Sequence, residues 1–134
     1  MTPVAVADTH TALWYLYDDP RLSLVVGDFI DAAAIAREDI AVSSISLVEV
    51  AYLVEKRRVP HTAYDDLAQA LADPEQMFVE APVSVAISDA LRKVSRNEVP
   101  DMPDRIIAAT GLFYNVPILS RDSRVRAANL KTIW

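Results

Sequence analysis

Short apolar runs alternate with longer helical stretches along this chain, and that alternation constrains its fold more than any other feature. The runs are rich in valine, isoleucine and alanine, which suits strands buried on both faces of a sheet. They are Val4–Ala7, Ile40–Ser43, Met77–Glu80, Val116–Ser120 and Thr132–Trp134. Strands that alternate with helices predict a three-layer α/β/α domain with a central parallel sheet of about four to five strands.

The intervening segments carry helix signals. We expect helices over residues 11–17, from Ser23, over Ser46–Arg57, from Thr62, over Ser84–Val94, from Pro100 and after Asp122. In the stretch Pro100–Thr110, Asp101 can cap the first turn, and Pro103 fits a first turn without losing a hydrogen bond. The helix that follows is apolar on several sides, so Asp104 at its start should lie on a buried face and need a partner.

Composition limits the classes of protein that this chain can represent. Its 134 residues suffice for one domain, which we expect to span residues 1–134. The absence of cysteine excludes a disulfide framework and a thiolate metal site. We see no signal peptide and no apolar run of membrane-spanning length, so we expect a soluble cytoplasmic protein. The net charge of −6 means that binding to nucleic acid would need a local basic rim, bound metal ions or both.

Four acidic residues fall at strand ends and helix starts. Asp8 and Asp122 follow strands, we expect Glu49 in the first turn of the helix after the second strand, and Asp104 opens the helix before the fourth. In a parallel sheet all four would meet at the carboxyl edge, where ligands bind. Carboxylates are the hard oxygen ligands that Mg²⁺ prefers, and such a cluster suits metal-assisted hydrolysis of a phosphodiester.

Helix capping is the competing interpretation of the same residues. Asp8, Asp101 and Asp122 each precede a helix, and Ser46 with Glu49 forms a possible capping box. Two observations favour a site. Glu49 lies within an apolar stripe, and independent caps have no reason to converge on one edge of a sheet.

At four places the residues resemble those of a known family, the PIN-domain nucleases, and above all the VapC-type toxins of bacterial toxin–antitoxin pairs. These places are Val6–His10, Ser43–Val50, Asp101–Thr110 and Ile118–Asp122, in that order along nearly the whole chain. The resemblance implies a PIN-like domain that acts as a Mg²⁺-dependent endoribonuclease, with Mn²⁺ as a possible substitute. It also implies an RNA substrate, a cognate antitoxin and a homodimer.

The resemblance also implies residue roles. Asp8, Glu49, Asp104 and Asp122 match the family's catalytic and metal-binding acidic quartet, and Asp101 matches an additional acidic position and is a further candidate metal ligand. Thr9 and Ser120 stand at hydroxyl positions near the site and are candidates for RNA contacts. Gly111 departs from the alanine often found there, which bears on packing rather than on chemistry.

Other polar and aromatic residues allow more than one role. Arg121, Arg124 and Arg126 lie near Asp122 and are candidates for contacts with RNA phosphates. Basic residues 56–58 could also contact RNA phosphates, but in the last turn of a helix they more often complement its dipole. The two histidines belong to no recognisable acid–base pair, and we expect neither to be catalytic. The aromatic residues of segment 14–17 are more than a short helix can bury, so we expect some of them in the core and others in protein contacts.

Two other functions stay open at this point. The first is an aspartyl-nucleophile phosphatase that uses Asp8. Such enzymes usually have a second aspartate two positions later, where this chain has His10, and a lysine near the pocket, which we do not find. The second is a non-catalytic binding module whose acidic residues cap helices or hold a structural ion.

Overall fold

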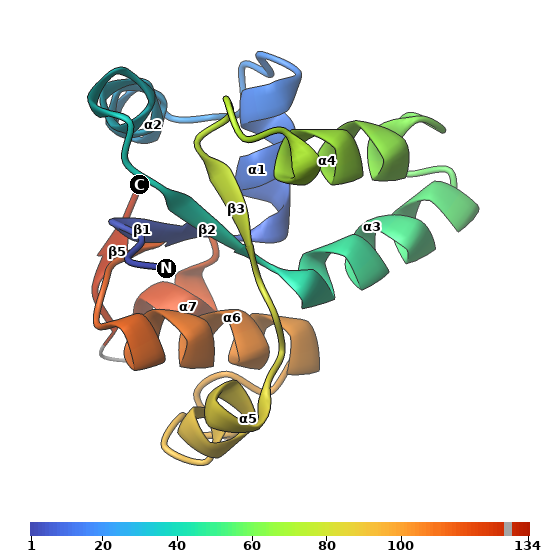
Figure 1. The fold of residues 1–134 in the computed structure, drawn as a ribbon. Coiled ribbons are helices and arrows are strands. Elements are labelled where there is room, and N and C mark those ends of the chain that lie inside the picture. The colour runs from blue at the N-terminus through green and yellow to red at the C-terminus, as the bar shows by residue number, and fades with distance from the viewer. Residues whose placement is uncertain (128–129) are drawn as a thin grey trace.

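A five-stranded, all-parallel sheet forms the centre of the molecule in a computed structural model, which describes residues 1–127 and 130–134 (Figure 1). The strands are β1 (Ala5–Ala7), β2 (Ile40–Ser43), β3 (Phe78–Ala81), β4 (Ile118–Leu119) and β5 (Thr132–Ile133). Their order is β3-β2-β1-β4-β5, so the chain adds strands on one side of β1 and then on the other. The predicted parallel α/β fold is confirmed, and the order reverses between β1 and β4, where ligands bind in such sheets.

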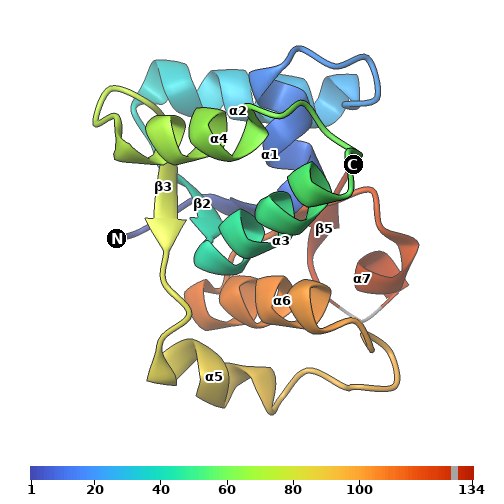
Figure 2. The same ribbon diagram turned by 90° about the vertical axis from the view of Figure 1, so that its right-hand side faces the viewer.

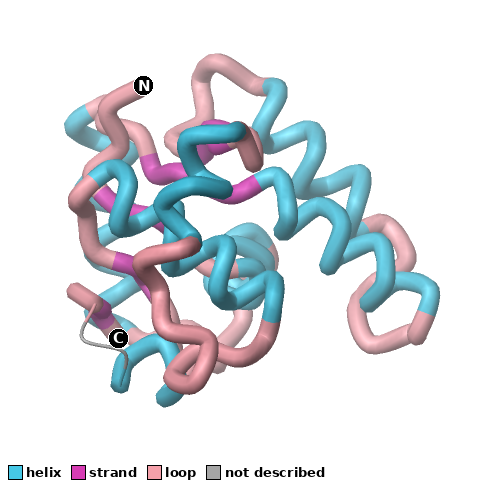
Figure 3. The backbone as a smooth tube through the Cα atoms, turned by 90° about the horizontal axis from the view of Figure 1, so that it is seen from below, coloured by secondary structure: helices cyan, strands magenta, loops and turns pink. Residues whose placement is uncertain are grey.

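Seven helices cover this sheet in the part of the chain that the structure describes. They are α1 (Thr9–Leu16), α2 (Leu24–Ala36), α3 (Ser44–Glu55), α4 (Ala63–Ala72), α5 (Val85–Leu91), α6 (Met102–Tyr114) and α7 (Ser123–Ala127). The short strands lie among these helices (Figure 3). None of the described helices is long and apolar enough to cross a membrane.

The alternating side chains of β1 divide the interior into two cores. Ala5 and Ala7 face a core built with α1, α2 and α4, whereas Val6 faces a second core built with α5, α6 and α7. Figure 2 shows α2, α1 and α4 on one side of the sheet and α6 on the other, with α5 packed outside α6. This is the three-layer arrangement expected for strands that are apolar on both faces.

The start of α3 differs from the prediction. We expected this helix to begin at Ser46, but it begins at Ser44, because the Ser43 hydroxyl at the end of β2 accepts a hydrogen bond from the Ile45 amide at 3.2 Å. The strand therefore passes directly into the helix, and Glu49 lies in its second turn. The proposed capping box of Ser46 and Glu49 is consequently wrong.

The apolar stripe expected around Glu49 is also only partly buried. Val48 and Tyr52 are 52% and 61% exposed on the outer side of α3. The helix α3 leaves the sheet edge and packs mainly on α4 and α6, so among the described residues these two side chains on its outer side stay exposed (Figure 1). The half-buried position of Glu49 therefore comes from its neighbours in the site.

The contact between α6 and β4 explains the glycine at position 111. A Cβ atom added there would lie 2.7 Å from Cγ1 of Ile118, closer than side chains pack. The glycine lets α6 approach the strand closely. This approach fixes the path of α6, and the start of α6 carries Asp104.

Candidate functional site

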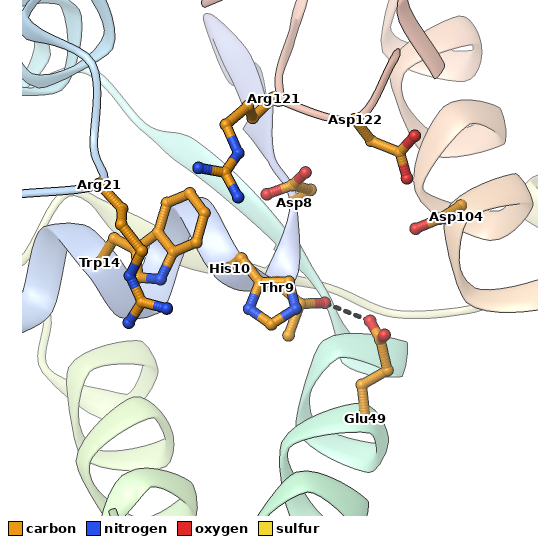
Figure 4. Close-up of a pocket in the computed structure, with 9 residues that line it drawn as sticks. All are labelled: Asp8, Thr9, His10, Trp14, Arg21, Glu49, Asp104, Arg121 and Asp122. Atoms are coloured by element: carbon orange, nitrogen blue, oxygen red, sulfur yellow. Dashed lines mark hydrogen bonds between the residues drawn. The ribbon is translucent and has the colours of Figure 1, made fainter. Parts of the chain in front are cut away.

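An open cavity of about 330 Å³ lies at the carboxyl edge of the sheet, beside the switch between β1 and β4. All four carboxylates of the predicted quartet line it, as Figure 4 shows. Its remaining lining residues are Thr9, His10, Trp14, Arg21 and Arg121. The structure thus brings together side chains from four segments that are far apart in the sequence.

Asp8 both caps a helix and faces this cavity. One carboxylate oxygen accepts a hydrogen bond from the Thr11 amide at 2.9 Å, which caps α1. The other accepts a hydrogen bond from the Ser120 hydroxyl at 2.5 Å, next to the end of β4. Capping and site membership are therefore compatible, because the cap orients the carboxylate at the end of β1.

Glu49 reaches the cavity from α3 and is held by Thr9. The Thr9 hydroxyl lies 2.5 Å from Oε1 of Glu49 and 2.8 Å from the hydroxyl of the buried Ser46. Burial is the largest influence on the Glu49 carboxyl and raises its pKa, while the Thr9 hydrogen bond opposes this rise. Thr9 is itself only 2% exposed, so its hydroxyl serves mainly to orient this carboxylate.

Asp104 lies half-buried in the first turn of α6, and its pKa is raised to about 7. Burial is the main cause, followed by the negative charges of Asp101 and Asp122 and then of Glu49. Several carboxylates close together resist simultaneous ionisation, which is the electrostatic sign of a convergent acidic cluster. Asp101 caps α6 by accepting a hydrogen bond from the Asp104 amide at 3.1 Å, and it is not among the residues that line the cavity.

The segment after β4 supplies Asp122, the last of the four carboxylates that form the acidic end of the cavity. The Asp122 amide donates to the Ser120 hydroxyl at 3.0 Å, and Oδ1 of Asp122 accepts from the Arg124 amide at 2.9 Å. Ser120 is fully buried and donates to Asp8, so its surroundings favour an orienting role over direct contact with RNA. Arg124 is exposed and does not line the cavity, and the Arg126 side chain lies outside the described part of the structure.

The donors at this end of the cavity fit a hard divalent cation. All are carboxylate oxygens, and besides burial the negative charges of neighbouring carboxylates raise the pKa of Asp104, charges that a cation would neutralise. Among the described residues, no three His, Cys, Asp or Glu side chains are already arranged as a metal-binding group. The carboxylates therefore surround the cavity without forming a closed coordination shell, so binding would draw them together.

The opposite end of the cavity is basic and aromatic, which the sequence did not indicate. Arg121 was a candidate for phosphate contact, but Arg21 was not, and Trp14 was expected in the core or in a protein contact. In the structure, the guanidinium carbons of Arg21 and Arg121 lie 5.0 and 4.8 Å from the centre of the Trp14 ring. His10 stacks on the same ring at 5.6 Å. The sequence shows basic residues at positions 10, 21 and 121 but does not indicate that they meet, because only the fold brings them together.

Comparison with known proteins agrees with this architecture. The family model of the PIN domain matches residues 5–130. The chain is similar to Ribonuclease VapC22 of Mycobacterium tuberculosis, with 28% identity over 131 residues that cover 95% of this chain and 92% of that protein.

Two solved structures share the fold. The structure of VapBC2 from Rickettsia felis bound to a DNA fragment from its promoter superposes with a TM-score of 0.70, at 17% identity and with 96% of each chain covered. The structure of FitAcB from Neisseria gonorrhoeae gives 0.61 at 17% identity, over 97% of this chain and 96% of that chain. Since the PIN model spans almost the entire sequence, the chain belongs to the PIN-domain family.

Proposed function

We propose that this protein is a divalent-metal-dependent endoribonuclease that acts as the toxin of a toxin–antitoxin pair. The catalytic and metal-binding residues would be Asp8, Glu49, Asp104 and Asp122. The similarity to Ribonuclease VapC22 supports the choice of RNA as the substrate. The observation that carries the proposal is the convergence of these four carboxylates on one cavity at the switch point of the sheet.

The surroundings of the carboxylates support separate roles in this site. Ser120 and the Thr11 amide fix the orientation of Asp8, and Thr9 fixes that of Glu49. Asp104 has a raised pKa, and it would bind a cation in its deprotonated form. A bound Mg²⁺ would supply Lewis-acid stabilisation of the charge on the phosphate and lower the pKa of an attacking water. Mn²⁺ would be expected to substitute, because it accepts the same oxygen ligands.

Cleavage assays with defined RNA oligonucleotides test this function. We expect cleavage with Mg²⁺ and none after EDTA. Direct attack by water would leave a 5′-phosphate and a 3′-hydroxyl, which mass spectrometry identifies. A 2′,3′-cyclic phosphate formed equally well in EDTA would show that the 2′-hydroxyl is the nucleophile, and the assignment of a metal-dependent enzyme would then fail.

We also propose two protein partners, a cognate antitoxin and a second copy of this chain. Exposed apolar side chains on α2 and α3 support protein contacts, notably Leu24 and Ile35 on α2 and Val48 and Tyr52 on α3. Size-exclusion chromatography with light scattering would measure the mass of the isolated chain. A monomer at all accessible concentrations contradicts the dimer, and unrestricted growth on expression without a partner contradicts the toxin role.

A further inference from the structure

A second cavity continues from the basic end of the first. Its volume is about 250 Å³, and it shares His10, Trp14 and Arg21 with the site cavity. It extends between α1 and the segment after α3, where Arg58 lines its far side. One groove therefore runs from the four carboxylates, past the Trp14 ring, to Arg58.

We propose that Arg121, Arg21 and Arg58, the basic arm of this groove, bind successive phosphates of a single-stranded RNA on one side of the cleaved bond. This inference rests on the proposed function, and it adds the path of the substrate. A positively charged groove that follows the backbone is a general means of holding single strands without reading sequence. It also supplies the local basic rim that a chain of net charge −6 needs in order to bind RNA.

Trp14 acts as the anchor of the basic arm rather than as a stacking platform for bases. Trp14 is 7% exposed as a residue, and its ring packs edge-on against Trp134 at 5.9 Å, so little of it is open to a nucleotide. Arg21 and Arg121 lie against it at cation–π distance. The ring thus restrains two flexible side chains near the acidic end, which reduces the entropy that they would lose on binding a phosphate.

The two arginines that Trp14 restrains differ in available charge. Arg21 forms a bidentate ion pair with Asp19, with its Nη2 atom 2.7 Å and its Nε atom 3.0 Å from the carboxylate oxygens. In the described part of the chain, the Arg121 side chain has no ion pair. Arg121 is therefore the stronger phosphate ligand, and Asp19 weakens the contribution of Arg21.

Fluorescence anisotropy of a labelled single-stranded RNA in EDTA tests the arm without requiring cleavage. Arg121→Gln and Arg58→Gln should each weaken binding by roughly three- to tenfold and reduce the slope of log affinity against log salt by about 0.7. Arg92→Gln is the matched control, because it removes the same charge from an exposed side chain just after α5, which does not line the groove, and it should bind as wild type does. Thermal melts would confirm that all of these variants fold.

Asp19→Asn is expected to strengthen RNA binding, a result that a misfolded variant would not give. Asparagine can still accept the hydrogen bond from the Arg21 amide at 2.9 Å but no longer neutralises the guanidinium. RNA binding should therefore become tighter, by roughly two- to fivefold. The paired variant Asp19→Asn/Arg21→Gln should lose this gain.

The outcomes separate this inference from the proposed function. If wild type binds RNA in EDTA through the arm but never cleaves with Mg²⁺, the nuclease assignment fails and the arm stands. If wild type cleaves while Arg121→Gln and Arg58→Gln bind RNA as well as Arg92→Gln does, the arm is wrong and the nuclease stands. No measurable binding in EDTA, or variants that lose only a protein partner, would also overturn the arm.

Discussion

The two ends of the groove are positioned by different interactions. At the acidic end, a backbone amide and buried hydroxyls orient Asp8 and Glu49. Asp8 directly follows β1, and Glu49 lies in α3, the helix that follows β2. At the basic end, Arg21 and Arg121 extend from segments outside helices and strands and are restrained by one aromatic ring. The acidic end is thus built by the fold, and the basic end by side-chain packing added to it.

This difference has an electrostatic consequence. The fold buries Asp104 among other carboxylates, and burial together with their charges raises its pKa to about 7, so its ionised form is unfavourable in the absence of a cation. The basic end carries no comparable strain, since Arg21 already has a counter-ion and Arg121 is exposed. We therefore expect substitutions at the acidic end to affect catalysis and metal binding, and those at the basic end to affect RNA affinity.

The largest expected effect is the loss of cleavage in Asp8→Asn and Asp104→Asn. Asparagine preserves size and the ability to cap but loses the charge that a cation needs. Removing a ligand should cost more than removing the partner of a ligand, so we expect a loss of more than about a hundredfold in cleavage rate with Mg²⁺. The folded circular dichroism spectrum should be unchanged.

His10→Gln is the matched comparison from the other end, because His10 also lines the cavity. Its cleavage rate should stay within about tenfold of wild type, since general acid–base catalysis is worth roughly a hundredfold or more. A larger loss in His10→Gln than in Asp104→Asn would move the chemistry to the histidine. The basic end, and not the acidic end, would then be the catalytic part of the groove.

The response of stability to Mg²⁺ is expected to be the next largest effect. Mg²⁺ should stabilise wild type by about 2.7 kcal/mol at a hundredfold excess over its dissociation constant, and Arg121→Gln by the same amount. Asp104→Asn should gain much less. In EDTA it should melt at or above wild type, because one like charge is gone and the new side chain keeps its place. Equal shifts in all three proteins, at matched ionic strength, would show that Asp104 belongs to no cation site.

The same difference explains what the sequence could predict. Strands and helix starts are local patterns, and residues just after parallel strands, or early in the helices beside them, lie at the carboxyl edge of the sheet. Asp8, Glu49, Asp104 and Asp122 could therefore be placed together from their positions in the sequence alone. Asp101 remains a predicted metal ligand, although its side chain caps α6 and acts on Asp104 through its charge.

The basic arm could not be predicted in this way. Arg21, Arg58 and Arg121 lie in three separate loops, and Arg21 and Arg121 meet only where both lie over the Trp14 ring. No periodicity connects residues at such spacings, so nothing in the sequence indicates that they share one groove. The exposed Val48 and Tyr52 were missed for a related reason. A helical stripe shows which residues are apolar but does not show that α3 leaves the sheet edge.

The smallest expected effect is a pH dependence of stability in the metal-free protein. The pKa of Asp104 rises from its ordinary value of 3.8 to about 7 in the folded state, so between these values the folded protein binds a proton that the unfolded chain does not. The free energy of unfolding should therefore fall as the pH rises through this window. The amplitude should be modest, because the half-exposed carboxyl is screened by solvent.

Thermal melts in EDTA between about pH 4.5 and pH 8 measure this dependence. The melting temperature of Asp104→Asn minus that of wild type should be largest near pH 8 and shrink toward pH 4.5, since asparagine has no proton to lose. Asp101→Asn sharpens the test. It keeps a side chain that can cap α6 but removes one of the charges that raise the pKa, so its transition should move to lower pH than in wild type. If Asp104→Asn and wild type instead differ by a constant amount at every pH, then neither burial nor the neighbouring charges raise the pKa of Asp104 in the folded protein. The acidic end would then be a set of independent caps, held no differently from the rest of the surface.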